Sequence, residues 1–240
     1  MHVKKLVFLC DRYPVRDHYP FNLEIFRKTD SIGFECPVTI FVGENGTGKS
    51  TLLEAIARRC GVHIWRNPMV QRVEGNPYEA ALWRYVTVEW VDGRVPGSFF
   101  GSAGFQDFAR SLEKWAVTDP RQLDYFGGRS LLTQSHGQSI LSYFRSRYQR
   151  KGIYFLDEPE TALSPKSQLA FLEILTAAGT TGTAQFIIAT HSPIILACPG
   201  AKIYSFDDVP ICARSYEETD HYRIYKEFLT GDRPKADPTN

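Results

Sequence analysis

Apolar residues run with little interruption through three short stretches of the chain, at residues 37–42, 153–156 and 184–190. A strand buried on both faces carries such a run, because neither face meets water. Stretches of helical composition occupy residues 52–60 and 165–178. Alternating strands and helices bring parallel strands into one sheet. The pattern therefore predicts a three-layer α/β fold with a mostly parallel central sheet.

Two further segments favour strands: residues 6–10 are a short apolar run, and residues 21–26 alternate apolar and polar positions. Residues 6–10 and 21–26 are typical of half-buried strands, and we expect them to form a small antiparallel β layer. Asp92 and Gly93 separate two strand-like segments, which predicts a β-hairpin of residues 85–91 and 95–100.

Two helices and one more strand complete the expected elements. An aromatic stripe at helical spacing over residues 105–115 favours a core-facing helix over a cofactor-binding surface; it consists of Phe105, Phe108, Leu112 and Trp115. A last strand at residues 202–206 is followed by a helix near 217–229.

The length of 240 residues suits a single domain, 1–240, with one insertion. We expect residues 1–61 and about 150–230 to form the core, and about 62–149 to form the insertion. The polar residues 231–240 are expected to be a mobile tail.

Charge and cysteine content indicate which partners and which cellular compartment suit the chain. The chain carries 28 basic and 27 acidic residues, so no whole-molecule field attracts polyanions. One local basic cluster is either the solvated end of a helix or a DNA contact: Arg145, Arg147, Arg150 and Lys151. Five scattered cysteines suggest a reducing cytoplasm. The uncharged stretch 174–201 is broken by Gly179, Gly182 and Pro193, so we expect no membrane span.

A complete phosphate-binding loop joins the first apolar run to the first helix. Its glycines let backbone N–H groups turn toward a phosphate, and its lysine can reach the β and γ phosphates. The serine hydroxyl can ligate Mg²⁺. The nucleotide-binding residues that we expect here are Gly43, Glu44, Asn45, Gly46, Thr47, Gly48, Lys49, Ser50 and Thr51. The chain is therefore expected to bind a nucleoside triphosphate.

The second apolar run ends in Asp157 and Glu158 before Pro159. Carboxylates at the carboxyl end of a parallel strand lie where ligands collect. Asp157 can hold Mg²⁺ through water, and Glu158 can orient or deprotonate an attacking water. A surface turn after a buried strand is the alternative.

The third apolar run leads into His191, 34 residues after Asp157. Because the connection is strand, helix, strand, both tips reach the same edge of the sheet. We therefore expect His191 to meet the γ-phosphate, although a histidine capping the core is the alternative.

Upstream of the acidic strand, Ser135, Gly137 and Gln138 lie at the start of a helical stretch that runs to about Tyr148. By itself this string is more typical of an ordinary helix N-cap. Its position before the acidic strand is what makes it a candidate functional motif.

In this order the motifs resemble those of the ATP-binding-cassette (ABC) ATPases. The resemblance implies a P-loop NTPase fold with an inserted helical signature arm, and ATP and Mg²⁺ as ligands. It implies that Ser135, Gly137 and Gln138 are signature residues, Glu158 the catalytic glutamate and His191 the switch histidine. Residues 161–164 occupy the place of the family's dimer-contact loop. His136 in the signature looks less like transporter cassettes than like small soluble bacterial ATPases related to RecF and SMC heads.

Two family features are not placed with certainty by this sequence. The glutamine that the family uses to touch Mg²⁺ and couple to a partner falls, by its usual distance, near Glu89 and Trp90; Gln106 is the substitute that we expect, with Gln71 as another nearby glutamine. The aromatic residue that stacks on adenine is one of three that precede the phosphate loop: Tyr13, Tyr19 and Phe21.

The leading hypothesis is a cytoplasmic Mg²⁺-dependent ATPase that forms a head-to-tail homodimer on binding ATP. Each ATP would lie between one chain's phosphate loop and the other chain's signature, and Lys49 and Glu158 would act in catalysis with His191. The alternatives are an energy-coupling subunit of a membrane permease, which the missing coupling glutamine disfavours, an ATPase of a DNA repair or defence complex, and a nucleotide sensor, which the intact Glu158 disfavours. A protein or DNA partner is expected more than a lipid surface.

Overall fold

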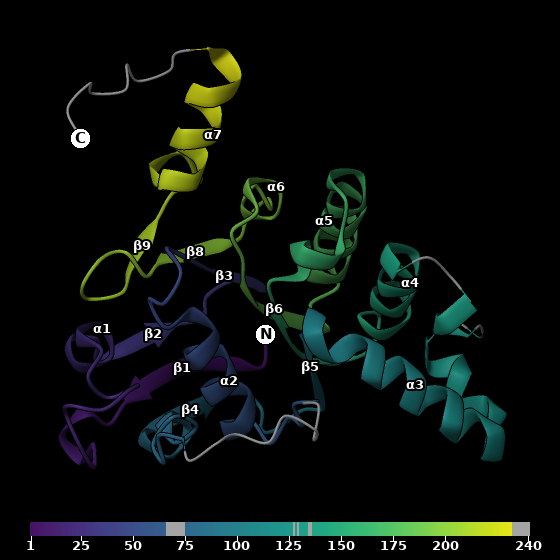
Figure 1. Ribbon diagram of the computed structural model, residues 1–240, viewed down its shortest axis with the longest axis horizontal. Helices are drawn as coiled ribbons and strands as arrows, with labels where there is room; N and C mark the ends of the chain where they lie inside the picture. The colour runs from purple at the N-terminus through teal and green to yellow at the C-terminus, as the bar shows by residue number, and fades with distance from the viewer. Residues whose placement is uncertain (66–74, 127, 129, 134–135, 232–240) are drawn as a thin grey trace.

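The computed structural model describes residues 1–65, 75–126, 128, 130–133 and 136–231, which form two β-sheets and the helices around them (Figure 1). Strands of the six-stranded sheet follow the order β5-β6-β7-β3-β8-β9, and the three-stranded sheet has the order β2-β1-β4. The larger sheet consists of β3 (Val38–Val42), β5 (Gly97–Gly101), β6 (Gly152–Asp157), β7 (Ala184–Ala189), β8 (Lys202–Ser205) and β9 (Cys212–Arg214).

The larger sheet is parallel except at one edge, as the continuous apolar runs predict. The strands from β5 to β8 pair in parallel, while β9 pairs antiparallel with β8. The register places Gly101 opposite Asp157, and Asp157 opposite Ala189, so these three strands end level with one another. This alignment brings the residues that follow the strands to one edge of the sheet.

The smaller sheet is antiparallel and consists of β1 (Val3–Phe8), β2 (Ser31–Gly33) and β4 (Val86–Trp90). The prediction of a strand at residues 21–26 was wrong. A turn and the short helix α1 (Glu24–Lys28) occupy this segment. Phe21 in the turn and the neighbouring residues Ile25 and Phe26 on α1 are all buried, so the buried positions do not follow the alternation of Phe21, Leu23 and Ile25.

The predicted hairpin around Asp92 and Gly93 was also wrong. Both of its strands exist, but β4 pairs with β1 in the smaller sheet, and β5 pairs in parallel with β6 in the larger one. Local alternation predicts a strand, but it does not determine with which other strand that strand pairs. The turn at Gly93, which has φ +93°, therefore leads from one sheet to the other.

Helices cover both faces of the larger sheet. On one face lies α2 (Lys49–Arg59), and on the other lie α3 (Ser102–Thr118), α4 (His136–Arg147) and α5 (Pro165–Thr180). The short α6 (Pro193–Leu196) follows β7, and α7 (Asp220–Thr230) projects away from the sheets in Figure 1. Single 3₁₀ turns lie at Cys10–Arg12, Leu82–Tyr85, Pro120–Phe126, Leu131–Thr133, Pro159–Ala162 and Tyr216–Glu218.

Within the predicted insertion of residues 62–149, β4 and β5 belong to the two sheets, so the part that stands out as an arm is helical and begins with α3. Phe105 and Leu112 on α3 are buried against α4, as the aromatic stripe predicts. Trp115, at the end of the stripe, stays 45% exposed and contacts Trp65.

Two hydrophobic clusters sandwich the larger sheet and produce the three layers. Side chains of β3 point alternately into the two clusters. Phe41 faces α2 and the smaller sheet, whereas Val38, Ile40 and Val42 face α3, α4 and α5. The fully buried Gln185 joins the two sheets, because its amide donates to Val3 O at 2.9 Å and accepts from Val3 N at 2.8 Å.

All five cysteines are free thiols. Among the helices of the described residues, none has the length and apolarity needed to cross a bilayer.

Candidate functional site

The phosphate loop lies between β3 and α2, and its glycines adopt conformations that other residues rarely take. Gly43, Gly46 and Gly48 have φ angles of +146°, +83° and +101°. A Cβ at Gly48 would lie 2.7 Å from the ring of Phe26, so the loop backbone passes directly over the core there. The exposed tip of the loop consists of Glu44, Asn45 and Gly46.

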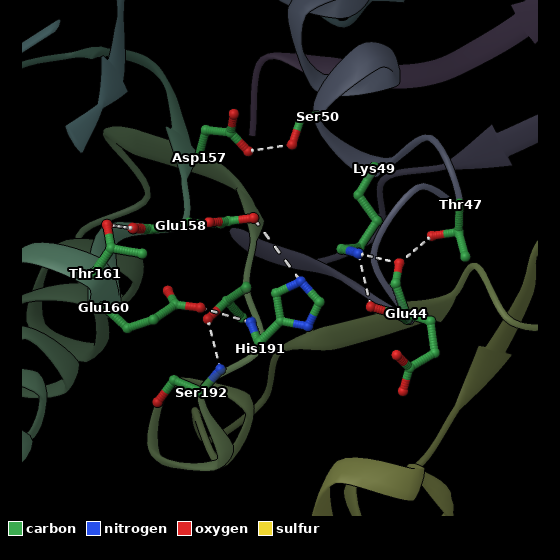
Figure 2. A network of polar contacts seen from close by, with 12 residues as sticks. Glu44, Thr47, Lys49, Ser50, Asp157, Glu158, Glu160, Thr161, His191 and Ser192 are labelled. Carbon is green, nitrogen blue, oxygen red and sulfur yellow. Dashed lines mark hydrogen bonds and ion pairs between the residues drawn. The ribbon is translucent and has the colours of Figure 1, made fainter. Parts of the chain in front are cut away.

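Lys49 begins α2 and folds over this loop. Its Nζ donates to the carbonyl oxygens of Gly43 at 2.6 Å and Glu44 at 2.7 Å, and only 5% of the residue is exposed (Figure 2). Burial lowers the pKa of Lys49, while the neighbouring carboxylates of Asp207 and Glu158 act in the opposite direction. The side chain is therefore a cation held at the centre of the loop, where a phosphate group can meet it.

Ser50 and Asp157 meet across the edge of the sheet. The Ser50 hydroxyl donates to Asp157 Oδ1 at 2.8 Å (Figure 2), which joins the start of α2 to the end of β6. Burial raises the pKa of Asp157 to about 6, although the Ser50 hydrogen bond lowers it. A buried carboxylate beside a hydroxyl is the oxygen donor set that Mg²⁺ prefers, so the two residues fit this ion.

Glu158 has the backbone conformation that glycine usually takes, with φ +44° and ψ +56°. Its N–H donates to Ala189 O at 2.9 Å, and Thr161 N–H and Oγ1 donate to its carbonyl at 3.1 and 2.7 Å. These bonds hold a backbone that is strained for a residue with a side chain. The turn directs the carboxylate toward His191, whose Nε2 lies 3.8 Å from Glu158 Oε1 (Figure 2).

His191 follows β7 and is held from two sides. Its backbone N–H donates to Glu160 Oε1 at 2.6 Å, and its ring Nδ1 lies 3.1 Å from Nε2 of His221. Burial lowers the pKa of His191, and the positive charge of Lys49 lowers it further. The ring is therefore neutral at pH 7.

The structure thus brings Lys49, Ser50, Asp157, Glu158 and His191 together at the carboxyl edge of the larger sheet, as the sequence predicts. Their convergence comes from the register of the parallel strands.

Three residues of this site were not predicted. Glu160 binds the backbone of His191, His221 meets its ring, and Asp207 accepts from Glu44 N–H at 2.7 Å. Glu160 follows the acidic motif closely enough to have been a candidate. His221 and Asp207 lie in polar stretches without any motif, so only the folded chain reveals them.

The loop of residues 161–164 and the loop after His191 are connected through α5. Gln168 is buried, donates from Nε2 to Leu163 O at 2.9 Å and accepts on Oε1 from the Ser192 hydroxyl at 2.6 Å. One side chain therefore holds the two loops that border the site.

The predicted signature lies elsewhere. Ser135 is outside the described residues, and Gly137 and Gln138 belong to the first turn of α4. In Figure 1, α4 is set apart from α2 and lies beside α5. Gly137 and Gln138 therefore are not brought to the phosphate loop of their own chain.

The expected coupling glutamines fall largely outside the described residues. Gln71 lies in the undescribed segment, and for Gln106 only the backbone, within α3 shortly after β5, is described. In the basic cluster, Arg145 and Arg150 are exposed, whereas Arg147 donates to Gly97 O at 3.4 Å and lies over the ring of Tyr154.

The three aromatic candidates for adenine stacking differ in their surroundings. Phe21 is fully buried, and Tyr13 packs against it at 4.8 Å between ring centroids while donating to Phe26 O at 2.9 Å. Both rings belong to the core. The Tyr19 hydroxyl instead bonds the hydroxyl of Thr51, one residue after Ser50.

Two segments of the chain match family models, and one curated protein is similar over most of the chain. Residues 133–197 match the family model described as "AAA domain, putative AbiEii toxin, Type IV TA system", and residues 21–61 match the model described as "AAA domain". The petrobactin import ATP-binding protein FpuD of Bacillus anthracis is 25% identical over 211 residues, which cover 79% of this chain and 76% of FpuD.

Among solved structures, a metal-chelate type ABC transporter in an inward-facing conformation matches with a TM-score of 0.52 and 17% identity, over 94% of this chain and 88% of that one. The SMC head domain from Thermotoga maritima has a TM-score of 0.48 and 15% identity, over 90% and 99% of the two chains. The fold is therefore that of the ABC ATPases. With the phosphate loop and acidic strand positioned on this fold, the chain resembles ATP-binding proteins of the ABC and AAA type.

Proposed function

We propose that this protein binds ATP with Mg²⁺, closes into a head-to-tail homodimer around two nucleotides, and opens when it hydrolyses them. The observation that carries the proposal is the convergence of Lys49, Ser50, Asp157, Glu158 and His191 at one edge of the sheet. These residue types supply a phosphate cradle, oxygen ligands for a cation and a carboxylate base.

Hydrolysis requires a water molecule to attack the γ-phosphorus in line with the leaving oxygen. Glu158 is the base in this proposal, because its carboxylate stands at the end of β6 and is 40% exposed, within reach of water. Lys49 neutralises charge on the phosphates, and His191 donates to the terminal phosphate. Ser50 and Asp157 would hold Mg²⁺, which when bound neutralises charge on the phosphate oxygens.

Dimerisation is proposed because the site of one chain is incomplete. The start of α4 lies apart from α2, so the signature serves ATP when a second chain supplies it. The residues proposed to reach the partner's nucleotide are Ser135, Gly137 and Gln138, and residues 161–164 are proposed to meet the partner.

Tyr19 is our choice for the adenine contact among the three aromatic candidates. Its hydroxyl bonds Thr51 on the helix of the phosphate loop, whereas Phe21 is fully buried and the ring of Tyr13 packs against the core. Its half-buried ring lines a hollow beside Ser50 and Thr51.

The catalytic role of Glu158 is tested by Glu158→Gln. The substitution removes the base but spares the residues around the phosphates, so hydrolysis should fall by roughly a hundredfold or more while ATP binding remains. Lys49→Ala is the matched control that should lose binding. Measuring hydrolysis and equilibrium ATP binding on both variants checks the assignment, and a Glu158→Gln protein with wild-type turnover would refute it.

A second candidate function is that of an energy-coupling subunit of an importer. It is favoured by the 25% identity to FpuD, which is named as an import ATP-binding protein. An aromatic hollow of about 350 Å³ between β5, α3 and α4 could receive a partner's side chain. Purifying the Glu158→Gln protein with ATP from its native cells separates the candidates, because a bound integral membrane protein supports the importer, and bound DNA or a soluble protein supports the repair or defence alternative.

A further inference from the structure

The ring of His191 has a partner on α7 that the proposed mechanism does not use. Nε2 of His221 lies 3.1 Å from Nδ1 of His191, and the ring centroids are 5.3 Å apart with the planes inclined by 42°. The separation and atoms are those of a nitrogen-to-nitrogen hydrogen bond. His221 belongs to the first turn of α7, 30 residues further along the chain.

The first turn of α7 is fixed relative to the loop that carries His191. Thr219 is buried and caps the helix by accepting from Tyr222 N–H at 3.3 Å. The Tyr216 hydroxyl, just before the helix, donates to Pro193 O at 3.0 Å. The segment leading into α7 is therefore attached to the residue that lies two positions after His191, and this attachment keeps the two rings in register.

A hydrogen bond between two neutral imidazoles needs one N–H group and one lone pair. Burial lowers the pKa of both His191 and His221, so both rings are neutral at pH 7. Two arrangements are then available. Either His191 accepts on Nδ1 and carries its proton on Nε2, or it donates from Nδ1 and leaves a lone pair on Nε2.

Glu158 distinguishes these arrangements. Nε2 of His191 faces Glu158 Oε1 at 3.8 Å, and an ionised carboxylate can only accept. A lone pair on Nε2 would face this negative charge, whereas an N–H group there is attracted to it. Nε2 is also buried without a hydrogen-bond partner in the described part of the chain, so its proton is free to be donated to an incoming group.

We propose that His221 is a positioning residue that donates from Nε2 to Nδ1 of His191, and so holds His191 in the tautomer that can donate from its own Nε2 to the terminal phosphate of a bound nucleoside triphosphate. The effect on turnover rests on the proposed function, whereas the pairing of the two rings does not. The same logic operates where a carboxylate or carbonyl orients a histidine ligand through its second ring nitrogen.

The pairing is tested in the nucleotide-free protein by ¹⁵N NMR of the histidine rings. The wild-type protein should show His191 with its proton on Nε2. His221→Ala should convert His191 to a mixture of tautomers, and Arg223→Ala, an exposed residue on the same helix, should leave it unchanged. A His191 spectrum that is identical in wild type and His221→Ala would overturn the proposal. This readout does not depend on hydrolysis, so it separates a failure of the pairing from a failure of the proposed function.

The effect on turnover is tested by steady-state kinetics. His221→Ala should lower kcat roughly tenfold or more with KM for ATP unchanged, because ground-state binding does not require the donor. His221→Gln should restore part of the loss, since its amide Nε2 can donate to Nδ1. In the His191→Ala background, His221→Ala should cause no further loss. Wild-type kcat in His221→Ala, or losses that add in the double variant, would contradict the role of His221.

Discussion

Asp157 combines two properties that oppose each other. It must be ionised to hold a cation, yet burial raises its pKa to about 6, well above the value of about 3.9 in an unfolded chain. Between these values the folded chain binds the proton and the unfolded chain does not, so the unfolding free energy falls as pH rises from about 4 to about 6. At neutral pH the nucleotide-free protein therefore carries the full cost of an ionised, buried carboxylate.

Asp157→Asn should remove this cost. Asparagine keeps the acceptor for Ser50 and carries no charge, so the nucleotide-free variant should be more stable than wild type at pH 7.5 by on the order of 2 kcal/mol, with the difference shrinking toward pH 4. Its Mg²⁺-dependent hydrolysis should be lost. Urea unfolding across this pH range measures the effect.

Asp208→Asn is the matched control with the opposite sign. The Arg214 hydrogen bond lowers the pKa of Asp208, so this carboxylate stabilises the fold when ionised, and its removal should lower stability at neutral pH. If wild type and Asp157→Asn depend on pH in the same way, Asp157 is not the source of the cost.

At the scale of elements, the site depends on loops that are fixed by single side chains. Gln168 on α5 is buried and bonds both the carbonyl of Leu163 and the hydroxyl of Ser192. The loop of residues 161–164 and the loop that carries His191 are therefore connected as one unit, even though Leu163 and Ser192 lie 29 positions apart along the chain.

Gln168→Leu should break this connection while preserving the volume of the side chain. It leaves a buried carbonyl and a buried hydroxyl without their partner, which should lower the unfolding free energy by about 1–3 kcal/mol. Lys166→Ala, an exposed change on the same helix, is the control and should have little effect. Chemical unfolding compares the two, and equal stability of Gln168→Leu and wild type would show that the hydrogen bonds are not needed.

The elements also show which parts of the fold could be predicted from the sequence. Continuous apolar runs predict the strands β3, β6 and β7. The helices between them predict that these strands pair in parallel. The partners of β4 and β5 could not be predicted, because pairing is decided by contacts far apart in the chain. The strand predicted at residues 21–26 was wrong for a different reason. Six residues are too few to distinguish the period of a helix from the alternation of a strand.

Some residues of the candidate site could be predicted from the sequence, and others could not. Lys49, Ser50, Asp157 and Glu158 belong to motifs whose chemistry explains their spacing, and the structure brings them together. His221 and Gln168 carry no such pattern, because their contacts form only when α7 and α5 pack beside the loop of His191.

For the molecule as a whole, the proposed function requires two chains that complete each other's sites. The phosphate loop and the acidic strand lie at one edge of the larger sheet, whereas Gly137 and Gln138, which we propose as signature residues, lie in the first turn of α4 (Figure 1). In the head-to-tail pair that we propose, the nucleotide would lie between the phosphate loop of one chain and the start of α4 of the other. The central claim is therefore that each composite site takes residues from both chains.

Mixing two inactive variants tests this claim most directly. Lys49→Ala removes the phosphate-loop cation, and Ser135→Arg blocks the signature, so each protein alone should be inactive. A heterodimer of the two has one intact composite site, and random mixing in equal amounts should restore about a quarter of wild-type hydrolysis. A mixture that stays inactive while heterodimers are demonstrably present, or a Ser135→Arg protein that hydrolyses ATP at the wild-type rate by itself, would contradict the shared site.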